Sequence, residues 1–251
     1  MFEALKLFFS SKEKVNIASL ELIGVDMHSH LIAGIDDGVK TIDEAIGIIL
    51  KLKSLGYRKI ITTPHIMKGG YNNTPEIIHY EYSKLKEELA RRNVIFPIEV
   101  ASEYYLDETF LKLIVNEEKL LTFGDNYLLF ELSYMTRPSN METAFFEMNV
   151  AGYKPIMAHP ERYPYLLDKD LKTFKKIKEA GIYLQLNLFS LLGYYGKPAQ
   201  TIAQLLIDEE MIDFVGTDIH NSMQLNVLND CLNNEYVEKI MNFKGLKNNL
   251  L

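Results

Sequence analysis

Short apolar runs rich in β-branched residues alternate, along this 251-residue chain, with segments whose apolar residues recur at helical spacing. This rhythm is typical of βα units and predicts a parallel sheet. Seven runs are predicted as strands: 20–26, 59–63, 96–101, 127–132, 154–158, 182–187 and 213–217. No linker or internal repeat divides the chain, so we expect an α/β fold of one domain over residues 1–251, a somewhat distorted seven-stranded (β/α)7 barrel.

Several of the expected helices carry their own start and stop signals. Thr41 and Glu44 have the spacing of a capping box, and Gly56 is placed to end the helix that follows. Thr74 followed by Pro75, and later Pro198, mark two further helix starts. Residues 222–251 are expected to form a helical cap on the barrel.

Composition excludes several classes of protein. The 27 basic and 34 acidic residues give a net charge of -7 without a basic tract, which argues against nucleic-acid binding. No run approaches the roughly 20 apolar residues that a membrane span needs. The single cysteine, Cys231, and the lack of an export signal predict a cytoplasmic protein. Within the N-terminal extension, residues 1–19, Leu5, Phe8 and Phe9 are expected to lie on one side of a helix that docks on the body of the protein.

Five of the six histidines follow apolar runs, where parallel strands would end. His28 and His30 are two residues apart in an extended segment, so both imidazoles point to the same side and can reach one ion. Neutral imidazoles beside carboxylates are the ligand mixture that first-row metal ions favour. The pattern therefore predicts a polynuclear metal site at the carboxyl ends of the strands.

Two glutamates strengthen this prediction. Glu103 and Glu131 follow apolar strands, where an unpaired buried carboxylate would be costly and metal coordination would remove the penalty. Together with the histidines and two aspartates they make nine candidate ligands: His28, His30, Asp37, His65, Glu103, Glu131, His159, Asp218 and His220. Nine ligands suffice for two or three ions, and the ligand types suit Mn, Fe or Zn.

Seven motifs occur in order between residues 24 and 221: DMHSH, IDDG, TTPH, ASEYY, LFELS, AHPERY and TDIHN. In this order and spacing they resemble the polymerase and histidinol phosphatase (PHP) family. Within it, they are similar to the manganese-dependent protein tyrosine phosphatases of bacterial capsule and exopolysaccharide biosynthesis. The resemblance implies a distorted seven-stranded barrel that holds three divalent ions, with Mn²⁺ favoured over Fe or Zn by the family alone.

The resemblance also assigns roles to residues. It implies one ion on His28, His30, Glu103 and Asp218, a second on Glu103, Glu131 and His159, and a third on Asp37, His65 and His220. Arg162 matches the family arginine that binds phosphate, and a hydroxide bridging two ions would attack phosphorus. The implied substrate is the phosphotyrosine tail of a bacterial tyrosine kinase that controls polysaccharide export.

The chain departs from the family pattern at one place. Related tyrosine phosphatases have a second arginine shortly after the DxHN motif, whereas this chain continues with Ser222 and Met223. Lys68 and Lys197 are candidate replacements. Tyr104 and Tyr105 lie beside a motif glutamate and are candidates to contact an aromatic substrate, although packing is the commoner role of a tyrosine.

Two other functions are compatible with the same motifs. A small-molecule phosphatase of the histidinol-phosphatase type would share the barrel and its ligands. A regulatory metal-binding module with weak or no turnover would fit the absent second arginine, but the full ligand set opposes it. Relative kcat/KM on phosphotyrosine peptides and on histidinol phosphate separates the two kinds of phosphatase. Metal analysis and an aryl-phosphate assay separate an enzyme from the regulatory module.

Overall fold

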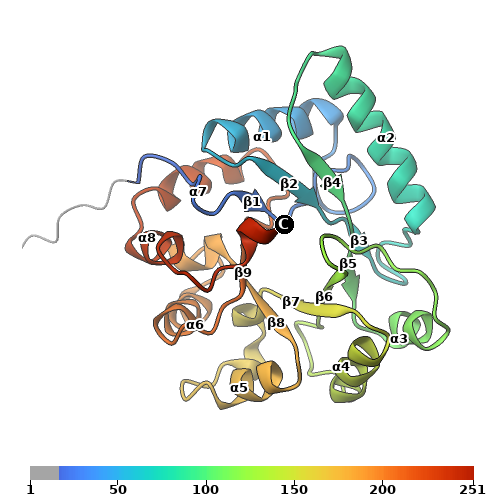
Figure 1. The fold of residues 1–251 in the computed structure, drawn as a ribbon, viewed down its shortest axis with the longest axis vertical. Helices are drawn as coiled ribbons and strands as arrows, with labels where there is room; N and C mark the ends of the chain where they lie inside the picture. The colour runs from blue at the N-terminus through green and yellow to red at the C-terminus, as the bar shows by residue number, and fades with distance from the viewer. Residues whose placement is uncertain (1–16) are drawn as a thin grey trace, which may run out of the picture.

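The computed structural model describes residues 17–251, in which eight α-helices lie outside nine short parallel strands (Figure 1). The strands are β1 (Val25–Asp26), β2 (Lys59–Thr62), β3 (His65–Ile66), β4 (Ile98–Val100), β5 (Glu103–Tyr105), β6 (Tyr127–Glu131), β7 (Lys154–Ala158), β8 (Tyr183–Asn187) and β9 (Phe214–Gly216). The helices are α1 (Ile42–Ser54), α2 (Pro75–Arg91), α3 (Glu108–Val115), α4 (Met141–Val150), α5 (Lys172–Glu179), α6 (Lys197–Asp208), α7 (Gln224–Cys231) and α8 (Glu235–Met241).

The parallel α/β architecture predicted from the sequence is confirmed, but the strands divide between two sheets rather than forming one continuous barrel. One sheet has the order β1-β2-β4, and the other has the order β3-β5-β6-β7-β8-β9. Every pairing between neighbouring strands is parallel. The carboxyl ends of successive strands therefore point to the same side of the molecule.

The division into two sheets arises just beyond the ends of two predicted runs, 59–63 and 96–101, where the chain forms a further short strand. Pro64, which has no N–H group, separates β2 from β3, and Ser102 separates β4 from β5. Beyond these breaks, His65 pairs directly with Glu103 in the second sheet. Nine strands therefore form where seven were predicted. The two that were not predicted, β3 and β5, each begin with a predicted metal ligand.

Backbone hydrogen bonds join the segment after β1 to the ends of two other strands. The Asp218 N–H donates to the His28 carbonyl at 2.8 Å, and the His30 N–H donates to the Ile219 carbonyl at 3.0 Å. Ser29, between these histidines, accepts from the Thr63 N–H at 2.7 Å. Residues that are almost 200 positions apart are thereby held side by side at the carboxyl ends of the strands.

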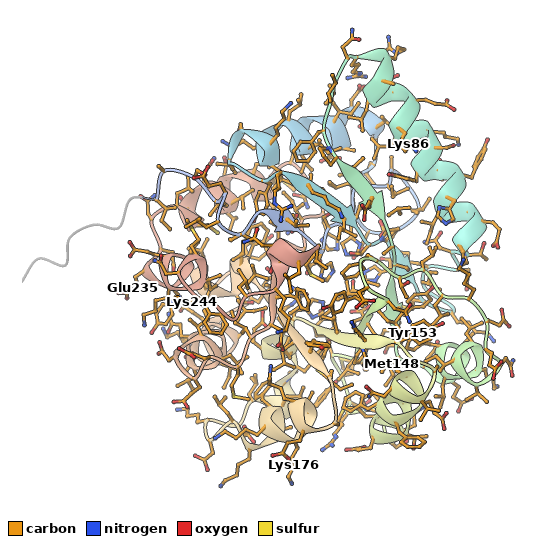
Figure 2. The ribbon with its side chains drawn as sticks, viewed as in Figure 1. Lys86, Met148, Tyr153, Lys176, Glu235 and Lys244 are labelled. Atoms are coloured by element: carbon orange, nitrogen blue, oxygen red, sulfur yellow. The ribbon has the colours of Figure 1, made fainter. Side chains whose placement is uncertain are left out.

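The predicted helix starts at Thr41 and Thr74 are confirmed, but the capping box of Thr41 and Glu44 is only half formed. Thr41 accepts from the Glu44 N–H and Thr74 accepts from the Ile77 N–H, as N-cap residues do. Glu44 does not return the capping-box bond to Thr41, because its carboxylate accepts from the Lys40 and Ser222 N–H groups. The helices bury one side each: Met148 of α4 points inward, whereas Lys86 of α2 and Lys176 of α5 point outward (Figure 2).

The C-terminal segment covers the amino ends of β1 and β9. After α7 and α8 the chain ends in a 3₁₀ turn, Asn248–Leu250, and Asn248 is fully buried. Its side chain donates to the Val25 and Val215 carbonyls at 2.8 and 2.7 Å and accepts from the Val215 N–H at 2.9 Å. The C-terminus lies near the centre of the view in Figure 1, beside the β1 label.

The predicted N-terminal docking helix, with Leu5, Phe8 and Phe9, lies outside the described residues. The described chain begins at Ile17, whose N–H donates to the Leu232 carbonyl at 2.8 Å. Between residues 17 and 251, no helix is long and apolar enough to span a bilayer.

We predict that Asn248→Ala lowers the free energy of unfolding by about 2 to 4 kcal/mol, because it leaves buried backbone groups of β1 and β9 without partners. Urea unfolding of the metal-free protein measures this. The neighbouring Asn249 is exposed and provides the matched control, Asn249→Ala, with a smaller loss. Equal losses in the two variants would contradict the role given to Asn248.

Candidate metal centre

The structure brings all nine predicted ligands together at the carboxyl ends of the strands. Seven of them line one cavity of about 290 Å³, and the other two, His28 and His30, are fully buried beside it. The cavity-lining ligands are Asp37, His65, Glu103, Glu131, His159, Asp218 and His220.

Glu103, at the start of β5, lies at the centre of the ligands. Its carboxylate is 3.1 Å from His28 Nε2, 3.4 Å from His30 Nε2 and 3.3 Å from His65 Nδ1. Its second oxygen is 3.1 Å from His159 Nε2. One carboxylate thus touches imidazoles supplied by three separate parts of the fold, the position that a bridging ligand would occupy.

The first ligand set, expected from the family resemblance, forms a compact group. Asp218 Oδ1 is 3.3 Å from Nε2 of both His28 and His30, and the same two nitrogens contact Glu103. His159 joins His28 and Asp218 in one geometric cluster and also contacts Glu103.

The other two expected ligand sets lie next to each other, and His65 is in contact with members of both. Asp37 Oδ1 is 3.5 Å from Nε2 of both His65 and His220, and His30 belongs to the same cluster. His65 Nδ1 also lies 3.4 Å from Glu131, so His65 adjoins the second expected set as well as the third.

The donor spacing fits divalent metal ions. Two ligand atoms that each lie about 2.1 Å from one ion are about 3.0 to 3.4 Å apart in octahedral or tetrahedral coordination. The contacts of Glu103 and Asp218 with the histidine pair His28 and His30 span 3.1 to 3.4 Å. His65 Nδ1 is buried without a hydrogen-bond partner among the described residues, which marks a nitrogen placed for a ligand.

The electrostatics of the cavity also favour cations. Burial and the nearby Arg162 lower the pKa of His159 to about 4, and burial lowers the pKa of His65, so both imidazoles are neutral at pH 7. Burial opposes the charge of Glu103, yet His28 and His65 hold its pKa well below the ordinary value. Burial and the charge of Glu103 raise the pKa of Glu131 well above the ordinary value. A cation bound here would remove the penalty of keeping both carboxylates ionised.

Two residues that the sequence analysis did not identify orient the buried histidines. Asp36 Oδ2 lies 2.8 Å from His30 Nδ1, and Gln185 Oε1 lies 2.8 Å from His28 Nδ1. In each case the contact leaves Nε2 directed at the carboxylates, as partners of metal-binding histidines do. The signals were present: Asp36 is the first aspartate of IDDG, and Gln185 is a polar residue within the apolar strand β8.

Two of the predicted ligands lie on left-handed backbone. His159, after β7, has φ 35° and Asp218, after β9, has φ 52°. Such angles are unusual for residues with a β-carbon and store strain of order 1 kcal/mol or more. The strain occurs where the chain turns to direct these two side chains into the cavity.

Arg162 lies at the cavity wall and does not pair with Glu161. Its NH1 donates to Asp218 Oδ2 at 2.7 Å, and its guanidinium lies 4.0 Å from the Tyr195 ring centroid and 5.0 Å from that of Tyr134. Glu161 is buried and accepts from Ser190 and Asn187 instead. Within residues 17–251, Arg162 is the only lysine or arginine that lines the cavity.

Asn187 and Tyr134 complete the surroundings of the cavity. Asn187 Nδ2 donates to Asp218 Oδ2 at 2.9 Å, next to the contact of Arg162. The Tyr134 hydroxyl lies 3.3 Å from His159 Nδ1, and the two rings are stacked. Tyr134 lies three residues after Glu131, and Asn187 is the last residue of β8, but neither belongs to one of the seven motifs.

The cavity lined by the seven predicted ligands is called the metal cavity below. Several candidate residues from the sequence do not reach it. Tyr104 points to the other face of β5 from Glu103, where its ring stacks on Phe110 and its hydroxyl accepts from the Leu121 N–H. Tyr105 is half-buried and does not line the cavity. Lys68 and Lys197 line two different cavities, so neither takes the place of the absent second arginine.

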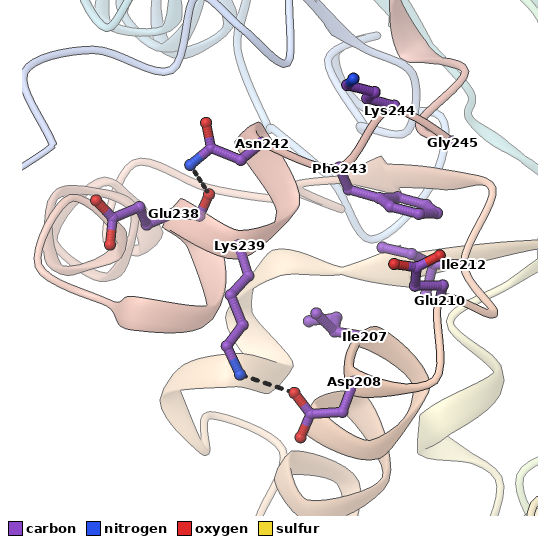
Figure 3. A pocket seen from close by; sticks show the side chains of 10 residues that line it. All are labelled: Ile207, Asp208, Glu210, Ile212, Glu238, Lys239, Asn242, Phe243, Lys244 and Gly245. Carbon is purple, nitrogen blue, oxygen red and sulfur yellow. Dashed lines mark hydrogen bonds and ion pairs between the residues drawn. The ribbon is translucent and has the colours of Figure 1, made fainter.

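A larger cavity lies elsewhere. It has a volume of about 870 Å³ and is formed by the C-terminal ends of α6 and α8 and the chain before β9 (Figure 3). Lys239 crosses part of it to an ion pair with Asp208 at 2.8 Å. This cavity is at the amino end of β9 and contains none of the predicted ligands, so volume alone does not locate the site.

Comparisons with known proteins agree with this arrangement. Residues 24–248 match the family described as capsular polysaccharide synthesis, CpsB/CapC. The chain is 30% identical over 203 residues to the tyrosine-protein phosphatase CpsB of Streptococcus agalactiae serotype V, covering 78% of this chain and 83% of that protein. It is 26% identical over 197 residues to the tyrosine-protein phosphatase YwqE of Bacillus subtilis, covering 78% and 77%.

A solved structure has the same fold. It comes from a study of Bacillus subtilis YwqE and Streptococcus pneumoniae CpsB, which are described there as metal-dependent tyrosine phosphatases. The superposition has a TM-score of 0.73 at 24% sequence identity and covers 88% of this chain and 95% of the other.

We predict that Asp36→Ala weakens Mn²⁺ binding by about 10- to 100-fold, because His30 loses the carboxylate that orients its ring. Calorimetric titration of the metal-free protein with Mn²⁺ measures this, and circular dichroism checks the fold. Asp43→Ala, at an exposed position of α1, is the control. Unchanged affinity in Asp36→Ala would contradict the orienting role.

Proposed function

The chain belongs to the CpsB/CapC family of capsular polysaccharide synthesis proteins, and we propose that it is a metal-dependent phosphatase that hydrolyses phosphotyrosine in proteins. One observation carries the proposal: seven predicted ligands and Arg162 line a single cavity. Relatives of this chain are named tyrosine-protein phosphatases, which supports the choice of substrate.

We propose three divalent ions, with Mn²⁺ as the physiological metal. His28, His30, Glu103 and Asp218 would hold the first, and Glu103, Glu131 and His159 the second. Asp37, His65 and His220 would hold the third. The donor clusters support the first and third sets. For the second, Glu103 contacts His159, but among the described residues the imidazole grouped with Glu103 and Glu131 is that of His65, which could therefore serve this ion as well. When bound, such ions lower the pKa of a water molecule and neutralise the charge of the phosphoryl oxygens.

Arg162 is proposed to bind the phosphoryl group. Its NH1 donates to Asp218, and a guanidinium has five N–H donors, so the planar fork can also donate to a phosphate oxygen. The guanidinium of Arg162 lies against the rings of Tyr195 and Tyr134, and these contacts restrict its movement. A held guanidinium stabilises developing negative charge without having to reorganise during the reaction.

Tyr134 is proposed to contact the phenyl ring of the substrate. It lines the cavity and is 37% exposed, so part of its side chain is accessible to a ligand. Burial raises the pKa of its hydroxyl well above the ordinary value, so the residue is a neutral aromatic surface at pH 7 rather than a base.

A cysteine nucleophile does not fit this chain. Cys231 is buried in α7, outside the metal cavity, and burial raises the pKa of its thiol to about 12. The thiolate that would attack phosphorus is therefore almost absent at pH 7.

The physiological substrate is proposed to be the phosphotyrosine tail of a bacterial tyrosine kinase. The family's assignment to capsular polysaccharide synthesis supports this choice. A higher kcat/KM for histidinol phosphate than for phosphotyrosine peptides would contradict it.

We predict that chelation with EDTA abolishes hydrolysis of p-nitrophenyl phosphate and that Mn²⁺ restores it better than Fe²⁺ or Zn²⁺. His159→Ala should remain inactive after Mn²⁺ is added, because it removes the imidazole that lies beside the Glu103 carboxylate and that would bind the second ion. Activity is measured after dialysis against each metal in turn. Hydrolysis that is indifferent to EDTA, or full activity in His159→Ala, would refute the proposed function.

We predict that Arg162→Ala lowers kcat/KM for p-nitrophenyl phosphate by about 100-fold, because the phosphoryl group loses a fixed charged donor. Arg162→Lys should recover little, since an ammonium group cannot reproduce the planar fork. Arg137→Ala is the control, because Arg137 is exposed and pairs with Glu142 outside the cavity. Equal activity in wild type and Arg162→Ala would exclude the phosphate-binding role.

A further inference from the structure

A second cavity, of about 570 Å³, adjoins the metal cavity. It lies between the chain that follows β3 and the end of α3, and it shares two lining residues, Met67 and Tyr71, with the metal cavity. We propose that this cavity binds the side chain of a residue that flanks phosphotyrosine in a peptide substrate. The inference rests on the proposed function and names a specificity-determining subsite beside it.

The wall between the two cavities is a tight turn. The Met67 N–H donates to the Tyr71 carbonyl at 2.9 Å, and the Gly70 N–H donates to the Met67 carbonyl at 3.2 Å. The ring of Tyr71 stacks on the metal-cavity residue His65, with centroids 5.3 Å apart and planes 9° apart. The metal cavity and its neighbour are therefore separated by about one aromatic side chain.

This turn is fixed to the strand that bears His65. The side-chain amide of Asn73 donates to the His65 carbonyl at 2.8 Å and to the Ile35 carbonyl at 3.0 Å. Gly69 donates to Asn72 within the turn at 2.9 Å. These bonds hold the second cavity at a constant distance from the metal ligands, as a subsite for a neighbouring residue requires.

The lining of the second cavity favours a large uncharged side chain. Its apolar walls include Ile66, Met67, Tyr104, Leu113 and Leu120. The charged residues of the lining, Lys68 and Lys119 against Glu76 and Glu118, cancel in sign. A pocket with apolar walls and no net charge rewards burial of an aromatic or large aliphatic group over a charged one.

The spacing suits a residue close to phosphotyrosine in sequence. Successive residues of an extended peptide advance by about 3.3 Å, so a side chain one to three residues away can pass the Tyr71 ring. The cavity has about twice the volume of the metal cavity, 570 against 290 Å³, and it accommodates a complete aromatic side chain.

The test uses a variant that fills the subsite. Thr109 of α3 is half-buried and lines the second cavity, so Thr109→Trp places an indole in it. The matched control is Thr201→Trp, because Thr201 is a half-buried threonine on α6 that lines a different cavity. The chain contains no tryptophan, so the emission of the new indole reports whether it lies in an apolar environment and whether the variant is folded.

The substrates are phosphotyrosine peptides with alanine at every flanking position and a single phenylalanine moved from three residues before to three residues after the phosphotyrosine. For the Mn²⁺-loaded wild type, we expect one phenylalanine position to raise kcat/KM about tenfold over the all-alanine peptide, the gain from burying one aromatic group. Thr109→Trp should lose that gain, and Thr201→Trp should keep it. p-Nitrophenyl phosphate, which has no flanking residue, is the reference for each variant.

The outcomes separate this inference from the proposed function. If no phenylalanine position raises kcat/KM, or if the gain survives in Thr109→Trp, the subsite is wrong while the phosphatase assignment stands. If neither the peptides nor p-nitrophenyl phosphate are hydrolysed, the proposed function itself is wrong. An equal gain from aspartate at the same position would overturn the preference for an uncharged side chain.

Discussion

The arrangement of the predicted metal ligands depends on the buried carboxylate of Glu103 and the four imidazoles that contact it. These imidazoles belong to His28, His30, His65 and His159, and their contacts with the carboxylate are 3.1 to 3.4 Å long. The imidazole nitrogens and carboxylate oxygens carry lone pairs that repel one another unless a positive charge lies among them. Metal ions would supply that charge, and without them the cluster must hold protons instead. The fold serves to bring these side chains to one point.

The sequence predicted much of this because parallel strands end on one side of a sheet. Polar residues that follow apolar runs therefore converge, and all nine predicted ligands do so. The sheet arrangement was harder to predict. The strand β3 has only two residues and begins after Pro64, and its pairing with β5 depends on a long-range register that no local pattern contains.

Most of the residues that position the predicted ligands and Arg162 were not predicted from the sequence. Asp36 and Gln185 orient histidines from positions that resemble an ordinary turn and an ordinary strand. Asn187, at the end of β8, donates to Asp218, and Tyr195, in the connection from β8 to α6, lies against Arg162. Tyr104 shows the opposite failure: it lies next to Glu103 in sequence, yet alternation along β5 sends its ring to the other face. Sequence proximity to a ligand is therefore a weaker guide than the side of the strand.

The central claim is that these side chains form one polynuclear metal site. Crystals of the Mn²⁺-loaded protein, with anomalous data collected at the manganese absorption edge, test it most directly. The account predicts three anomalous peaks in the cavity, at least one of them about 2.2 Å from an oxygen of Glu103. A cavity without anomalous density, or manganese bound only at other places on the protein, would contradict it.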